Sequence, residues 1–148
     1  MQNNIQQNWE SAARIINDWI QHQDQTISQV DNCCYDPNEI LEWSLKVQLF
    51  DCYLTLILND NDITLQLHLP LMMVPEPSNQ SPLFEELLRM NAVLLTHCSF
   101  GIEDDNQIVL LSDCSYRNLS SNTLDLMLKG VSNAIEQLQE RNLISSPN

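Results

Sequence analysis

Glycine is nearly absent from this sequence. The chain of 148 residues contains only two glycines, Gly101 and Gly130, where average usage of about 7% would supply roughly ten. A glycine-rich loop that cradles the phosphates of a nucleotide or a dinucleotide therefore has no residues from which to form. We expect no nucleotide-dependent chemistry, and we predict no cofactor of another kind.

Basic residues are scarce as well. Lysine and arginine together number six, against twenty aspartates and glutamates, so the formal net charge is −14 at pH 7. Nucleic-acid binding requires lysine and arginine to neutralise phosphates, and an anionic membrane surface repels an acidic protein. We therefore expect neither a nucleic acid nor a membrane as a partner. The same charge favours encounter with a basic protein.

Long apolar runs are also missing, and so is a basic segment ahead of an apolar one near Met1. No run approaches the roughly 18 apolar residues of a membrane-spanning helix. We accordingly expect a cytoplasmic protein without a signal peptide. The five cysteines are an odd number, which favours buried, reduced thiols over a disulfide framework. A redox role for Cys33 and Cys34, or for Cys98 and Cys114, stays open.

Two periodicities organise the apolar residues of the first half. The length and the 43% hydrophobic content are typical of one globular domain, residues 1–148. A 3.6-residue period predicts an amphipathic helix from about Asn4 to the mid-twenties, followed by a loop around Pro37. Strict alternation then predicts an antiparallel meander, in which Pro70, which cannot donate to a ladder, marks the end of the third strand or an edge. Its three strands are expected over residues 41–49, 54–58 and 63–69.

The second half is predicted to hold two helices and a hairpin. Ser81 followed by Pro82 indicates the start of a helix. A hairpin is predicted between Cys98 and Cys114, and Ser120 indicates the cap of a last helix that runs to about Arg141. The stripe of the first of these helices is expected to comprise Leu83, Phe84, Leu87, Leu88, Asn91, Leu94 and Leu95. The order α-β-β-β-α-β-β-α predicts an α+β sandwich with helices packed against an antiparallel sheet.

The stretch from Leu87 to Leu138 resembles the type III secretion chaperone-like fold, which includes the YbjN family. Two phrases carry the resemblance. Leu87-Leu88-Arg89-Met90-Asn91 ends a helix, and Leu119-Ser120 opens the last helix, with an acidic hairpin between them. The likeness is closer to YbjN than to chaperones dedicated to one secreted effector. It implies this α+β fold, a homodimer and the binding of other proteins.

No arrangement of chemically active side chains is predicted. The acidic turn Glu103-Asp104-Asp105 lacks the Asp-x-Asp-x-Asp-Gly spacing of a calcium loop, so we predict a solvated turn and no metal site. His97 and Cys98 are adjacent in a predicted strand, and adjacent strand side chains point to opposite faces. They are therefore not predicted to act as a base and a nucleophile. We expect a protein that is not an enzyme.

The segment Met72-Met73-Val74 lies between Pro70 and Pro75, outside the predicted strands and helices. Methionine suits adaptable binding surfaces, and exposed apolar patches usually mark interfaces. We predict that these three residues bind a partner, with burial over the sheet as the equal alternative.

Two functions are compatible with this sequence. The leading hypothesis is a non-catalytic protein-binding module, chaperone-like or regulatory, that binds a basic protein client as a homodimer. An open sheet edge would accept an extended client segment as an added strand. The alternative is a sensor domain that binds a small ligand or a metal.

Overall fold

The structure, a computed structural model, describes residues 2–23, 27–36, 40–60 and 62–144. The described chain combines helices with an antiparallel sheet, so the predicted α+β class is confirmed, and the predicted elements occur in their predicted order with one further strand before the meander. The elements are α1 (Gln2–Gln21), β1 (Ile27–Asp36), β2 (Ile40–Val47), β3 (Phe50–Asn59), β4 (Asp62–Met73), α2 (Pro77–Val93), β5 (Ser99–Ile102), β6 (Gln107–Ser115), the 3₁₀ turn η1 (Tyr116–Asn118) and α3 (Ser121–Glu140).

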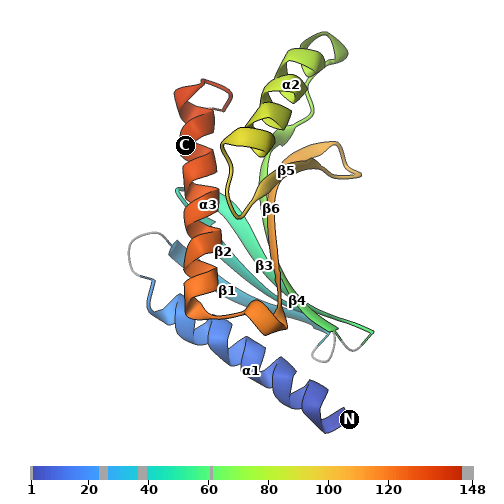
Figure 1. Cartoon of the computed structure of the whole chain (residues 1–148), viewed down its shortest axis with the longest axis vertical. Coiled ribbons are helices and arrows are strands. Elements are labelled where there is room, and N and C mark those ends of the chain that lie inside the picture. Colours follow the sequence, from blue (N-terminus) through green and yellow to red (C-terminus); the bar gives the residue numbers. More distant parts are fainter. Residues whose placement is uncertain (1, 24–26, 37–39, 61, 145–148) are drawn as a thin grey trace.

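The strands of the described chain form one six-stranded sheet in the order β1-β2-β3-β4-β6-β5. Each strand is antiparallel to its neighbours. The helices lie on one side of the sheet, with α3 crossing its middle and α1 and α2 toward opposite ends of the molecule (Figure 1). We call the other side the open face, because none of the described helices packs against it.

Alternation along β2, β3 and β4 builds the core. Every second side chain of these strands points toward the helices and is buried, as the period of two predicts. The buried set includes Trp43, Leu45, Val47, Leu54, Leu56, Leu65, Leu67 and Leu69. Each of these large side chains contributes about 1.5–3 kcal/mol by leaving water.

Two tryptophans connect α1 to the rest of the fold. The indole Nε1 of Trp19 donates a hydrogen bond to Oδ1 of Asp125 in α3, at 2.8 Å. The indole of Trp43 in β2 donates to Oδ1 of Asn17, at 2.9 Å. Because a buried indole N–H needs a partner, these two bonds determine how α1 lies against the sheet and α3.

The start of α3 is as predicted. The backbone N–H of Thr123 donates to Oγ of Ser120, at 3.1 Å, so Ser120 is the N-cap. Farther along α3, a Cβ added to Gly130 would lie 2.3 Å from the backbone oxygen of Thr96. Glycine at this position therefore lets α3 approach the loop between α2 and β5 closely.

The loop prediction before β2 is wrong. Residues 27–36 form β1, which pairs with β2 from Ile27 opposite Val47 to Asp36 opposite Ile40. Pro37 lies outside the described residues. β1 forms backbone hydrogen bonds with β2. Such pairing uses N–H and C=O groups, so β1 needs no apolar pattern of its own. The polar composition of this segment concealed the strand.

Of the two predicted places for Pro70, the end of a strand is wrong, because β4 continues to Met73, and an edge is what the structure shows. The pairing of β3 with β4 stops at Tyr53 opposite His68, so Pro70 lies beyond the part of β4 that β3 covers. A register shift between Pro70 and Met72 also interrupts the ladder to β6. A proline without an N–H is tolerated at such an edge or bulge.

The start of α2 also differs from the prediction. The helix begins at Pro77 rather than after Ser81, so Pro82 lies inside it. Pro77 occupies the first turn, where its missing N–H costs nothing and its fixed φ favours the helix. Pro77 and Pro82 both suit the first turn of a helix, and the helix begins at Pro77.

Candidate interaction surface

Helix α2 carries apolar residues on two of its faces. Leu87 and Met90 are buried in a small apolar cluster with Ile108 of β6 and Leu138 of α3. Leu88, one residue along from Leu87, is 66% exposed. A helix that only covered the core would show one apolar stripe. The second apolar face of α2 therefore lies outside the core.

An apolar groove lies between α2 and β5. It has a volume of about 180 Å³ and is lined by Phe84, Leu87, Leu88, Asn91, Phe100, Gly101 and Ile102. Ile102 at the end of β5 is 55% exposed, so large apolar side chains stand on both walls. We call this feature the α2–β5 groove. Exposed apolar patches of this kind mark interaction sites in proteins.

The amide of Asn91 holds the two walls together. Its Oδ1 accepts a hydrogen bond from the backbone N–H of Phe100, at 2.8 Å, and its Nδ2 donates to the backbone oxygen of Phe100, at 3.3 Å. These bonds engage polar groups of β5, the last strand of the sheet. An added strand is therefore disfavoured at this edge, while the groove keeps a defined shape.

The charged side chains of α2 are all in ion pairs. Arg89 Nη2 lies 2.6 Å from Oε1 of Glu85 on α2, and Arg141 at the end of α3 pairs with Glu86. Two of the six basic residues of the chain thus neutralise two of its twenty acidic residues at this helix. The formal net charge of −14 belongs entirely to the rest of the chain.

Two of the three predicted partner-binding residues lie in a strand, and Val74 follows its end. Met72 and Met73 belong to β4, opposite Ile108 and Gln107 of β6, which corrects their predicted place outside the strands. Met72 and Val74 are half-buried against the small apolar cluster, whereas Met73 is 59% exposed. Of the three, Met73 is the residue that presents most of its side chain to a partner.

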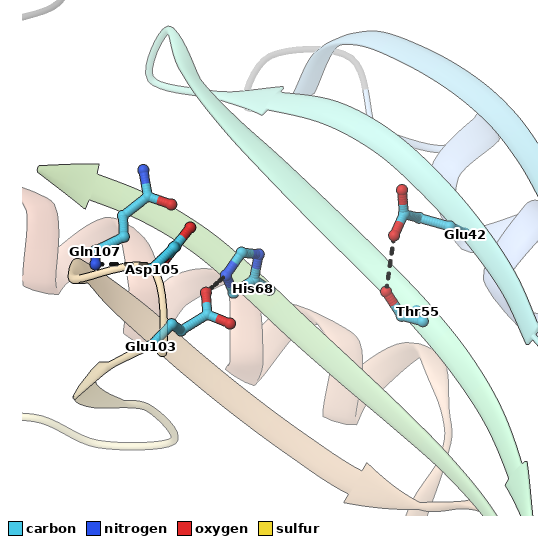
Figure 2. Close-up of polar contacts among 6 residues, drawn as sticks. All are labelled: Glu42, Thr55, His68, Glu103, Asp105 and Gln107. Atoms are coloured by element: carbon cyan, nitrogen blue, oxygen red, sulfur yellow. Dashed lines mark hydrogen bonds and ion pairs between the residues drawn. The ribbon is translucent and has the colours of Figure 1, made fainter. Parts of the chain in front are cut away.

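The open face of the sheet is polar. His68 of β4 contacts Glu103 from the turn after β5, and Oγ1 of Thr55 donates to Oε2 of Glu42 at 3.4 Å. Figure 2 shows both contacts on the same side of the sheet. The His68 ring also lies 6.0 Å from the ring of Tyr53. Because such side chains tolerate water, this face needs no covering helix.

The acidic stretch is a hairpin, as predicted. Its turn joins β5 to β6, and the Glu103 N–H donates to the backbone oxygen of Gln107 at 2.9 Å. Figure 2 shows Asp105 accepting from the Gln107 N–H, so a carboxylate of the turn binds the backbone. Among the described residues, no three His, Cys, Asp or Glu side chains gather in a way that could hold a metal ion.

The described cysteines are free thiols. Burial raises the pKa of Cys98 to about 11, and burial followed by the negative charge of Asp113 raises the pKa of Cys114 to about 11. Thiols with such values are protonated at neutral pH and react slowly. The side chains of Cys33 and Cys34 in β1 lie outside the part of the chain that the structure describes.

His97 and Cys98 do not form a base and nucleophile pair in this fold. His97 adopts a positive φ of 60° and precedes β5. Its backbone oxygen accepts a hydrogen bond from Oγ of Ser112, while the structure assigns no bond between its ring and Cys98. The arrangement holds the loop before β5 against β6.

Sequence reasoning missed the α2–β5 groove although it named all four of its α2 residues. It assigned Leu87 and Leu88 to one stripe, whereas the structure buries the first and exposes the second. The available signal was the width of that stripe, which is too broad for one buried face of a helix.

Comparison with known proteins adds no family to this description. The chain matches no protein-family model and no curated protein at a significant level. No helix within the described ranges combines the length and the apolar character needed to cross a membrane.

Proposed function

We propose that this chain is a non-catalytic protein-binding module, chaperone-like or regulatory, that works as a homodimer in the cytoplasm and binds a basic protein client. The observation that carries the proposal is the α2–β5 groove, with Leu88 and Ile102 exposed on its walls. Water-exposed apolar side chains on a rigid helix and strand provide the anchors that protein interfaces use.

The size of the groove supports a protein partner over a small ligand. Pockets that bind small molecules usually measure about 300–1,000 Å³, and the α2–β5 groove measures about 180 Å³. That volume accommodates a protruding side chain of a partner rather than a whole ligand. A sensor for small ligands, the alternative function, gains no comparable support from the groove.

The charges of α2 support a second copy as the partner at this helix. Two molecules with a net charge of −14 repel each other over most of their surface. The acids of α2 are paired, Glu85 with Arg89 and Glu86 with Arg141, so the helix and its partners carry no net charge. Two copies therefore meet at α2 with less repulsion than at the unpaired acidic parts of the chain.

A two-fold arrangement also matches the order of charges along α2. In a two-fold dimer, residue i of one copy meets residue j of the other and the reverse. If the α2 helices pack antiparallel with the two-fold axis level with residue 87, next to the exposed Leu88, Glu85 of each copy faces Arg89 of the other. The patch is then complementary to itself in both apolar surface and charge.

We assign client binding to the surface outside the α2–β5 groove. With the groove used for self-association, the acidic parts of the chain face solvent in the dimer. A surface of that sign attracts basic segments at long range and raises their association rate.

The experiment that tests the proposal replaces Leu88 with aspartate. A charge on the groove wall would be buried without a partner in the dimer, so we expect self-association to weaken at least about tenfold, a loss above 1.4 kcal/mol. The matched control is Leu49→Asp, because Leu49 is 63% exposed at the β2–β3 turn, away from the groove. Sedimentation equilibrium measures the dissociation constants, and thermal unfolding checks that both variants fold.

Three results are informative. Loss of self-association in Leu88→Asp alone supports the groove as the dimer surface. Equal weakening in Leu49→Asp would show a general effect of added negative charge. A wild-type protein that stays monomeric at every concentration tested would overturn the homodimer.

A further inference from the structure

Strand β6 is longer than the edge strand that covers it. β5 pairs with β6 only from Ser99 opposite Leu111 to Ile102 opposite Ile108. Residues 112–115 of β6 extend beyond this pairing, and among the described strands only β4 lies beside them. Figure 1 shows β5 next to just one part of β6. This side of residues 112–115 therefore has no strand partner in the described chain, and we call it the β6 margin; the loop before β5 lies against its first residue, where Oγ of Ser112 donates to the backbone oxygen of His97.

Two hollows open at the β6 margin. One of about 170 Å³ is lined by Gln66, Ser99, Leu111, Ser112 and Asp113. The other, of about 240 Å³, shares the last four of these residues and adds His97 and Cys98. The shared wall combines an aliphatic side chain with hydroxyl and carboxylate oxygens. Walls of this kind suit a long side chain with an apolar stem and a polar end.

Asp113 supplies the charge of these hollows. Its side chain is exposed, and among the described residues it takes part in no hydrogen bond through its carboxylate and in no ion pair. Other acids of the open face are engaged, since Glu103 contacts His68 and Glu42 accepts from Thr55. Gln66, which lies opposite Asp113 in the sheet, adds an amide oxygen beside the carboxylate.

We propose that the hollows at the β6 margin receive an arginine or lysine side chain of the client, with Asp113 binding the cationic group and Leu111 packing against the aliphatic stem. The client segment lies extended along the β6 margin, where a strand can be added to the sheet. This inference rests on the proposed function, because it names the part of the surface that binds the basic client. It does not involve the α2–β5 groove.

The test uses a short fluorescent peptide of alternating threonine and arginine. A second peptide carries citrulline in place of arginine, which keeps the shape and removes the charge. Fluorescence anisotropy measures the affinity of both peptides for the wild type, Asp113→Asn and Asp104→Asn. Asp104 is an exposed acid in the β5–β6 turn, at the other end of β6, so its replacement changes the net charge equally.

We expect Asp113→Asn to weaken binding of the arginine peptide by about threefold to fivefold, the size of a partly exposed ion pair. Asp104→Asn should change it less than about 1.5-fold, since surface changes away from the contact have small effects. The citrulline peptide should bind more weakly, with no response to Asp113→Asn. Equal weakening by both substitutions, equal affinity for both peptides, or no binding at all would overturn the site at Asp113.

The same measurement in Leu88→Asp separates this inference from the homodimer. A monomeric Leu88→Asp variant that still binds the arginine peptide through Asp113 supports two independent surfaces. A peptide that binds only the dimer would overturn the assignment of the site to the β6 margin of one chain. If the wild type does not self-associate, the homodimer fails, and the response to Asp113→Asn still decides the client site.

Discussion

Helices α3 and α2 use their apolar residues differently. α3 buries Leu124, Met127, Leu128, Val131, Ala134, Ile135 and Leu138, and only Leu126 among its large apolar side chains is exposed. α2 buries Leu87 and Met90 and exposes Leu88 and Val93. The comparison shows that one helix serves the core alone, while the other has apolar surface beyond what the core accepts. Surface of that kind is where a partner gains by binding.

The largest expected difference between the two helices is in stability. Ile135 is fully buried in the main core, so Ile135→Ala should lower the free energy of unfolding by about 2–5 kcal/mol. Leu88→Ala removes an exposed side chain and should stay within about 0.5 kcal/mol of the wild type. Urea unfolding of dilute, monomeric protein measures both. A Leu88→Ala loss as large as that of Ile135→Ala would show that α2 has no spare apolar face.

A charge-exchange experiment tests the proposed contact between the α2 helices of two copies, and its expected effect is of intermediate size. Glu85→Lys leaves two positive charges at positions 85 and 89 of α2, and Arg89→Glu leaves two negative charges at these positions. Each variant alone should self-associate about fivefold more weakly, because like charges meet across the two-fold axis. An equimolar mixture should recover the wild-type affinity, since opposite charges then meet between copies. Sedimentation of single and mixed samples measures this.

The mixing result isolates contacts between copies. The Glu85–Arg89 pair within one helix is broken in both variants, and mixing does not restore it. The matched control is Lys129→Glu, an identical change in charge on α3. A mixture of Glu85→Lys with Lys129→Glu should not recover the affinity. Recovery in that control, or none in the main mixture, would contradict antiparallel packing of α2.

The smallest expected effect concerns Met73. This residue is exposed at the end of β4 and does not line the groove, so we propose a peripheral contact. Met73→Ser should weaken self-association by about twofold or less, as is usual for the rim of an interface. Met72→Ser should instead reduce stability, because Met72 packs against the small apolar cluster. If Met73→Ser abolished self-association, the main contact would be the end of β4 rather than the groove.

The strands with alternating leucines were predictable, and so were the last helix with its Ser120 cap and the acidic hairpin. Each depends on a local pattern that a single segment carries. β1 was not predictable in this way, because its pairing comes from β2 and not from its own polar sequence. The continuation of β4 past Pro70 was equally hidden, since it depends on where the pairing with β3 stops.

The sequence by itself determined the α+β class, the order of most elements, the absence of a glycine-rich phosphate loop and the acidic character of the chain. These properties follow from composition and from periods along the chain. Only the tertiary structure decided that Leu87 is buried while Leu88 is exposed, and that Asp113 stands at an uncovered strand margin. The reason is physical: burial and free edges depend on which other elements lie next to a residue, and the packing of distant segments decides that.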